Sequence, residues 1–183
     1  MIVCLTIFSF GANAQNKTVN LHDGWQFRQE GGTKWYAATV PGEVHTDLLN
    51  NKLIPDPYYR DNEKKLQWIE KKNWEYKKSF QLSAETLKKK HSELVFDGLD
   101  TYASVYLNGK LVLKADNMFR QWRVNVKPYL RSGENSLKIV FESAQNVVDS
   151  LAKKDLPFVL PANPRPYVRK AQYHFGWDWG PKL

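Results

Sequence analysis

The sequence has little cysteine and no long hydrophobic run. Cys4 is the only cysteine among 183 residues, so no disulfide can form within one chain. No apolar run reaches the roughly 18 residues that a membrane-spanning helix needs, so we predict no membrane span. The G-x-S-x-G, H-E-x-x-H and G-x-x-x-x-G-K-[ST] patterns are absent as well. These absences argue against a serine-hydrolase elbow, a zincin and a phosphate-binding loop, and we predict neither metal nor cofactor.

What is present predicts one folded domain. The chain is 42% hydrophobic and 14% aromatic, with seven tryptophans, which is enough apolar surface to offset the entropy of ordering. The formal net charge is +8, and many of the lysines fall between Lys64 and Lys90.

The lysine-rich stretch has two interpretations. Lysines interleaved with Trp68, Trp74 and Tyr76 are typical of surfaces that bind nucleic acid or anionic polymers. Acidic residues alternate with these lysines, however, which favours a solvated strand face and helix end. We therefore predict no nucleic-acid partner.

The first 14 residues predict a signal peptide. Ile2–Phe10 is a short apolar core, and Ala12-Asn13-Ala14 has the small-x-small pattern that precedes cleavage. No positively charged side chain precedes Ile2, so a buried N-terminal strand is the alternative. Cleavage would remove Cys4, begin the mature chain at Gln15 and export the protein to the periplasm or the extracellular space.

Residues 15–183 predict an all-β domain. Apolar residues alternate with polar ones at period two, which is typical of strands with one buried face. The stretch 74–82 shows this alternation. One side carries Trp74, Tyr76, Phe80 and Leu82, and the other carries Glu75, Lys77 and Gln81. Asn108-Gly109 predicts a tight hairpin between residues 102–107 and 111–114. This pattern indicates a jelly-roll β-sandwich.

Three short helices and a long C-terminal loop complete the prediction. The helices are expected at residues 43–50, 83–90 and 145–154, with Ser83 as an N-cap. Residues 157–183 are rich in proline and aromatic residues, so we expect an ordered loop that returns toward the sheet.

The aromatic end of this loop is the best candidate site. Four aromatic rings surround Asp178 between Tyr173 and Trp179. Sugars bind to such mixtures, because flat ring faces contact aromatic side chains while a carboxylate accepts hydrogen bonds from hydroxyls. The alternative is that Trp177 and Trp179 fill the core and Asp178 caps a turn. The four histidines, of which His45 and His174 are the most distinctive, lack metal-ligand spacing.

The same loop carries a resemblance to a known family. Residues 167–181, which end in W-D-W-G-P, resemble the end of the N-terminal domain of β-mannosidases in glycoside hydrolase family 2. Four other stretches fit that family, at residues 21–27, 40–48, 55–63 and 96–103. The W-D-W-G-P and P-D-P-Y-Y strings are specific to the mannosidase branch. The resemblance implies a galactose-binding-like jelly roll, in agreement with the strand pattern.

The resemblance also implies a function and a set of site residues. Family members hydrolyse terminal β-D-mannose with retention, using two glutamates on a barrel of about 250 residues. None of the chain's glutamates matches those positions, so we assign no catalytic residue. The implied substrate-binding residues are Trp177 and Asp178, with Trp179, His174 and Arg169 in a supporting role. The implied partners are a mannose-containing oligosaccharide and the family's immunoglobulin-like and barrel domains. Because the catalytic barrel is not in this sequence, the resemblance implies that the chain is inactive by itself. The closing strand of the jelly roll should follow the W-D-W segment, so we also expect the domain to be incomplete at its C-terminus. A stand-alone carbohydrate-binding module is the alternative.

Overall fold

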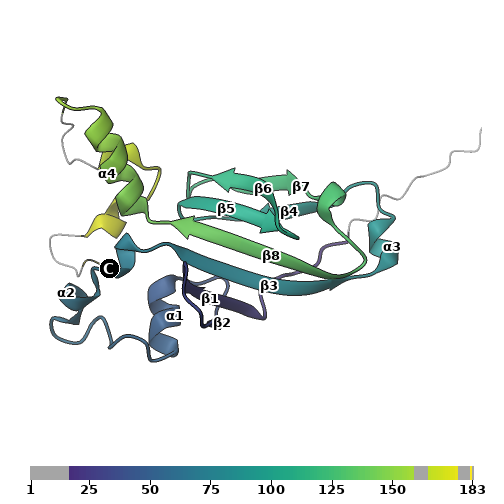
Figure 1. The fold of residues 1–183 in the computed structure, drawn as a ribbon, viewed down its shortest axis with the longest axis horizontal. Helices are drawn as coiled ribbons and strands as arrows, with labels where there is room; N and C mark the ends of the chain where they lie inside the picture. The colour runs from purple at the N-terminus through teal and green to yellow at the C-terminus, as the bar shows by residue number, and fades with distance from the viewer. Residues whose placement is uncertain (1–16, 159–164, 177–181, 183) are drawn as a thin grey trace, which may run out of the picture.

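A computed structural model of the protein describes residues 17–158, 165–176 and 182. Two antiparallel sheets form the framework (Figure 1). The large sheet has the strand order β2-β1-β3-β8-β5-β6, and the small one pairs β4 with β7. The strands are β1 (Trp25–Gln29), β2 (Tyr36–Ala38), β3 (Trp74–Leu82), β4 (Glu93–Phe96), β5 (Tyr102–Leu107), β6 (Lys110–Ala115), β7 (Trp122–Asn125) and β8 (Gly133–Glu142). The predicted antiparallel β-sandwich is confirmed.

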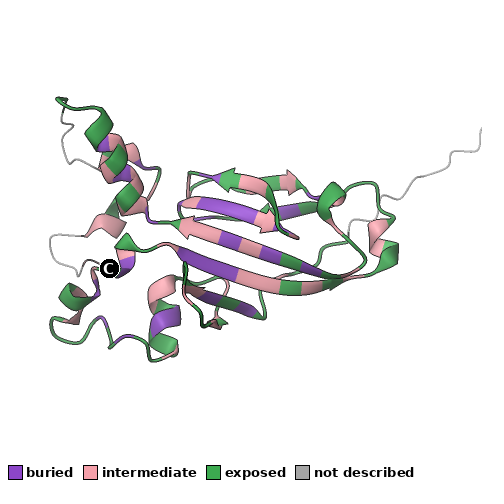
Figure 2. Cartoon of the chain, viewed as in Figure 1, coloured by how far each residue is buried: buried purple, intermediate pink, exposed green. Residues whose placement is uncertain are grey.

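The hydrophobic core lies on the inner face of the large sheet. Phe27, Val105, Leu107 and Leu137 have at most 1% of their surface exposed. Leu94 of β4 belongs to the same cluster, and Trp122 and Val124 of β7 pack against it. Buried and more exposed residues alternate along β8, whereas β3 and β5 each contain a run of three buried residues, as the colours of Figure 2 show.

The predicted hairpin is present. Asn108 and Gly109 both have positive φ, at 50° and 79°, and they connect β5 to β6. Glycine adopts this backbone conformation without strain, and asparagine tolerates it better than most residues. The Asn108 side chain also donates to Asn135 Oδ1 at 2.8 Å, which ties the hairpin to β8.

The predicted helices are present, with somewhat different ends. They are α1 (Val44–Asn50), α3 (Ala84–Leu87) and α4 (Ala144–Lys154). Ser83 caps α3 as expected, because its hydroxyl accepts from Thr86 N at 3.2 Å. Sequence analysis did not predict α2 (Asn62–Leu66) or the short 3-10 helices η1 (Ile69–Lys71), η2 (Lys127–Tyr129), η3 (Arg165–Tyr167) and η4 (Gln172–Phe175). In Figure 1, α1, α2, α4 and the C-terminal segment gather at one end of the large sheet, whereas α3 lies at the other end.

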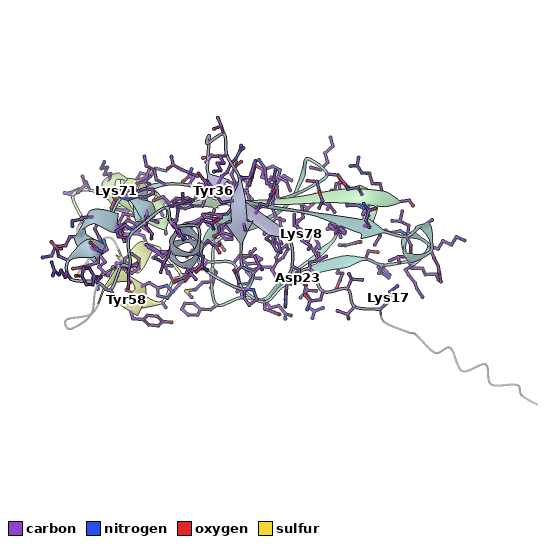
Figure 3. All side chains as sticks on the ribbon, turned by 90° about the horizontal axis from the view of Figure 1, so that it is seen from below. Lys17, Asp23, Tyr36, Tyr58, Lys71 and Lys78 are labelled. Carbon is purple, nitrogen blue, oxygen red and sulfur yellow. The ribbon has the colours of Figure 1, made fainter. Side chains whose placement is uncertain are left out.

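The lysine-rich stretch does not form one patch. Lys64 and Lys65 lie in α2 and the exposed Lys88 follows α3, at the opposite end of the molecule (Figure 1). Figure 3 likewise shows Lys71 and Lys78 at different positions along the long axis. Two of the aromatic residues between these lysines, Trp74 and Tyr76, are 7% and 8% exposed and belong to the core. They are therefore not available for stacking on bases.

Candidate functional site

The candidate site lies where the C-terminal segment returns to the sandwich. Trp177, Asp178 and Trp179, the main candidates from the sequence, lie outside the described residues. The structure describes the residues on both sides of them, up to Gly176 and again at Lys182. Between residues 165 and 176 the segment consists of the short helices η3 and η4 joined by loop, and this described part agrees with the predicted ordered loop.

Backbone contacts fix the path of residues 167–171. Asn117 and Arg169 form an isolated parallel bridge, and Met118 N donates to Arg169 O at 3.0 Å. The Tyr102 hydroxyl donates to Tyr167 O at 3.2 Å. Val168 and Ala171 are buried beside these contacts. Arg169 therefore holds the segment through its backbone, while the residue as a whole is exposed.

Side-chain contacts fix the residues that follow. Lys170 Nζ forms an ion pair with Asp100 Oδ2, and His174 Nδ1 lies 3.5 Å from the same oxygen. Asp100 belongs to the loop between β4 and β5. His174 also packs edge-on against Tyr173, with ring centroids 4.6 Å apart. His174 therefore contacts the β4–β5 loop, and its supporting role in substrate binding stays a prediction.

The far side of the segment is held as well. Lys182 Nζ forms a 2.9 Å ion pair with Glu70 Oε1 in η1. Gln67, immediately after α2, donates from Nε2 to Lys182 O at 2.8 Å. Residues 177–181 are therefore preceded and followed by residues that bind the domain itself.

Two histidines in this region have lowered pKa values. Burial is the main cause of the lowered pKa of His174; Lys170 adds to it, while Asp100 and Glu43 oppose it. Burial also lowers the pKa of His45 in α1, against the opposing charges of Glu43 and Glu70. The charge of Lys170 acts on both rings. The start of α1, the β4–β5 loop, η1 and the C-terminal segment thus form one electrostatic cluster.

The charged groups of this cluster hold the C-terminal segment against the rest of the domain. Glu70 and Asp100 each pair with a lysine, so both carboxylates are engaged in holding the segment. Within the described part of the chain, every buried side-chain nitrogen or oxygen has a hydrogen-bond partner, and no three His, Cys, Asp or Glu residues form a group suited to a metal ion. The described helices include none with the length and apolarity to cross a bilayer.

Sequence analysis missed Asp100 and Glu70 as parts of this cluster. Asp100 belongs to one of the stretches that resemble the family. A sequence motif of this kind does not indicate which distant residue its carboxylate pairs with.

A separate open hollow of about 380 Å³ lies beside the end of α4 and is lined by Lys154, Asp155, Leu156, Phe158 and Tyr167. Neither Arg169 nor His174 is among its lining residues.

Comparison with known proteins identifies the family. Residues 25–183 match the family described as glycosyl hydrolase 2 galactose-binding domain-like. The chain is 34% identical to a β-mannosidase of Bos taurus over 91% of its length and 41% identical to β-mannosidase B of Emericella nidulans over 89%. It spans 20% of the length of each of these relatives.

Solved structures agree with this match. A β-D-mannosidase from Dictyoglomus thermophilum superposes with a TM-score of 0.83 at 47% identity, covering 87% of this chain and 20% of the other. An exo-chitosanase from Amycolatopsis orientalis, at 18% identity and a TM-score of 0.58, shares the fold. The chain belongs to the galactose-binding-like domain family of glycoside hydrolase family 2, and it is similar to the N-terminal domains of β-mannosidases.

Proposed function

We propose that this chain is the N-terminal domain of an exported, retaining β-mannosidase, in which it supplies one wall of the pocket for terminal β-D-mannose. Its similarity to proteins named β-mannosidase from three sources supports this proposal. The observation that carries it is the anchoring of the segment around the W-D-W-G-P string. Lys170 and His174 meet Asp100 on one side, and Lys182 meets Glu70 on the other.

In the proposed role the domain binds sugar and leaves bond cleavage to other domains. Trp177 would offer an apolar face to the mannose ring, and Asp178 would accept hydrogen bonds from its hydroxyls. Retaining glycosidases need two carboxyl groups about 5 Å apart. In the proposed enzyme these belong to a barrel in the remaining length of the polypeptide, beside an immunoglobulin-like domain.

The test of this role is Asp178→Ala in the complete β-mannosidase that carries this domain. Loss of the carboxylate leaves sugar hydroxyls unpaired, so kcat/KM for a β-mannoside should fall by the equivalent of about 2–4 kcal/mol. Asp149→Ala in α4 is the matched control and should leave kcat/KM unchanged. An unchanged kcat/KM for the Asp178→Ala enzyme would show that Asp178 does not contact the substrate.

A stand-alone carbohydrate-binding module is a second candidate. It is favoured by the fact that both flanks of residues 177–181 bind the domain itself, so the segment has anchors without any other domain. Isothermal titration of the 183-residue chain with mannose and mannobiose separates the two functions. Measurable binding supports the module, whereas the enzyme function predicts none, because one wall of a pocket binds a sugar poorly.

Export is the third part of the proposal, and it rests on residues 1–14. If the signal peptide is removed as proposed, the N-terminal residue of the secreted protein is Gln15. N-terminal sequencing or intact mass of protein recovered outside the cytoplasm measures this directly. Retention of Met1 and Cys4 in the mature protein would contradict export through this segment.

A further inference from the structure

One end of the domain gathers positively charged side chains from three separate parts of the sequence. The parts are residues 88–92 after α3, residues 108–110 at the β5–β6 hairpin, and residues 127–131, which begin with η2. Together they contain six lysines and arginines and no aspartate or glutamate, although the whole chain has 19 acidic residues. We call these three parts the basic end, and its cations are Lys88, Lys89, Lys90, Lys110, Lys127 and Arg131.

Hydrogen bonds join the three parts of the basic end. Val126 N, next to the third part, donates to Ser92 O in the first at 2.8 Å. The side chain of Asn135, which is 0% exposed, joins the other two parts. Its Oδ1 accepts from Asn108 Nδ2 at 2.8 Å and from Arg131 N at 3.0 Å, and its Nδ2 donates to Arg131 O at 2.8 Å. The domain itself therefore holds these loops together, which lowers the entropic cost of binding a ligand to them.

The cations of the basic end have no acidic partners in the described part of the chain. None of the six takes part in an ion pair, whereas Glu93, beside the first part, already pairs with Arg123 at 3.6 Å. Glu85 and Glu134 flank the basic end in the sequence and leave an excess of positive charge. Five of the six cationic residues are exposed, and Lys127 is half-buried. Positive charges that are gathered without internal neutralisation attract a polyanion.

The composition of the basic end favours an anionic polysaccharide over other polyanions. Tyr129, which is 39% exposed, is its only tyrosine, tryptophan or phenylalanine and its only large exposed hydrophobic residue. Single-stranded nucleic acid is usually held by several stacked rings, and a membrane surface by apolar side chains that enter the bilayer. The carboxylate or sulfate groups of a glycan need mainly cations that donate charge-assisted hydrogen bonds. The match to a glycoside hydrolase family also makes glycans the expected polymers.

We propose that the basic end binds an anionic polysaccharide, which is a glycan chain that carries carboxylate or sulfate groups. Residues 88–90 supply three neighbouring cations, and Lys110, Lys127 and Arg131 supply the others from the adjoining loops. The end of the large sheet that carries α3 lies opposite the end at which the C-terminal segment gathers (Figure 1). A polymer bound there leaves that segment uncovered, so the inference is independent of the proposed mannose pocket.

The test measures the binding of heparin, as a sulfated polysaccharide, to the complete polypeptide that carries this domain. The triple variant Lys88→Gln, Lys89→Gln and Lys90→Gln removes three charges and keeps polar side chains. Its Kd for heparin should rise by about tenfold or more at low salt, and the dependence of the Kd on salt should weaken. The matched control replaces three exposed lysines at the opposite end by glutamine, namely Lys64, Lys71 and Lys153. It removes the same charge and should change the Kd by less than about twofold, because salt screens charges at that distance.

A second variant tests whether the separate loops act together. Lys110→Gln combined with Lys127→Gln leaves the three lysines after α3 in place and should raise the Kd by roughly three- to tenfold. This double variant also replaces the triple variant if circular dichroism shows that the triple variant does not fold. Dextran, a polysaccharide without charged groups, should show no binding that depends on any of these residues.

Each contrary outcome overturns a defined part of the inference. An equal loss in the control at the opposite end would overturn it entirely, because overall net charge would then be the cause. A loss in the triple variant with none in the double variant would overturn the surface assembled from three loops. Tighter binding of duplex DNA or of phosphatidylglycerol vesicles than of heparin, at the same salt concentration, would overturn the assignment to a polysaccharide. None of these results would alter the proposed function, which the Asp178→Ala enzyme tests separately.

Discussion

The hydroxyl of Tyr76 donates a 2.9 Å hydrogen bond to Asp47 Oδ2 inside the domain. Tyr76 lies in the central strand β3 and Asp47 in α1, the helix that also carries His45. Thr39 N donates to the other carboxylate oxygen at 2.8 Å, so Asp47 links α1 both to the sheet and to the chain after β2. Burial raises the pKa of Asp47 and that of Tyr76, because charge is costly to hold in this interior.

Tyr76→Phe should lower the free energy of unfolding by about 1–3 kcal/mol, because it leaves one oxygen of the buried Asp47 without its donor. Urea denaturation measures the change. Tyr36→Phe is the matched control, since Tyr36 also packs near Phe27 but is only half-buried, and it should cost much less. Equal effects of the two changes would show that the Tyr76–Asp47 bond contributes little.

The ion pairs of Glu75 lead us to expect that the folded domain loses stability in acid. Burial by itself would raise the pKa of Glu75, but hydrogen bonds from Lys138 and Arg28, with their charges, hold it below its ordinary value of 4.5. The folded state therefore favours the ionised form. Its contribution is present above pH 4.5 and is lost as the pH falls toward the lower folded pKa.

Urea denaturation from pH 6 to pH 3 checks this prediction with two variants. Glu75→Gln should weaken the dependence of stability on pH in the acid range. Glu142→Gln changes an exposed glutamate in β8 and should leave that dependence as it is in the wild type. A wild-type pH profile for Glu75→Gln would mean that its two ion pairs do not favour the folded state.

The lowered pKa values of two histidines lead us to expect a second loss of stability, which begins as the pH falls below about 6.5. Burial lowers the pKa values of His45 and His174, so the folded state binds a proton less readily than the unfolded chain. Stability is then fully present above the ordinary histidine value of 6.5 and declines as the pH falls below it. Denaturation between pH 7.5 and pH 5.5 should show this decline, and His45→Gln should reduce it. A flat profile in the wild type would contradict the prediction.

Removing the buried ring of Phe27 should leave a cavity in the core and lower the stability of the domain. The ring is 0% exposed and lies among Tyr36, Trp74 and Tyr76, with centroid separations of 5.7 to 6.2 Å. Phe27→Ala should lower the free energy of unfolding by about 3–5 kcal/mol. Phe119→Ala removes a ring that is 68% exposed and should have a far smaller effect, as measured by thermal and urea denaturation.

Local features of the fold could be predicted because their causes are local. The strand at residues 74–82, the positive-φ pair Asn108-Gly109 and the Ser83 cap each depend on a few neighbouring residues, and all three are confirmed. Glu75 shows where this reasoning stops. The alternation places it on the polar side of β3, yet it is only 4% exposed, because Arg28 and Lys138 from the neighbouring strands cover it.

The amino-acid sequence by itself determined the order of the main strands and the family resemblance of the W-D-W-G-P segment. Only the tertiary structure decided which charges hold that segment. Lys170 and Asp100 are 70 residues apart, and Lys182 and Glu70 are 112 apart. Periodicity depends on backbone geometry over a few residues, whereas an ion pair between distant residues depends on how whole elements pack. Asp100 and Glu70 could therefore be identified as partners of the segment only from the packing of the loops and helices at one end of the sheet.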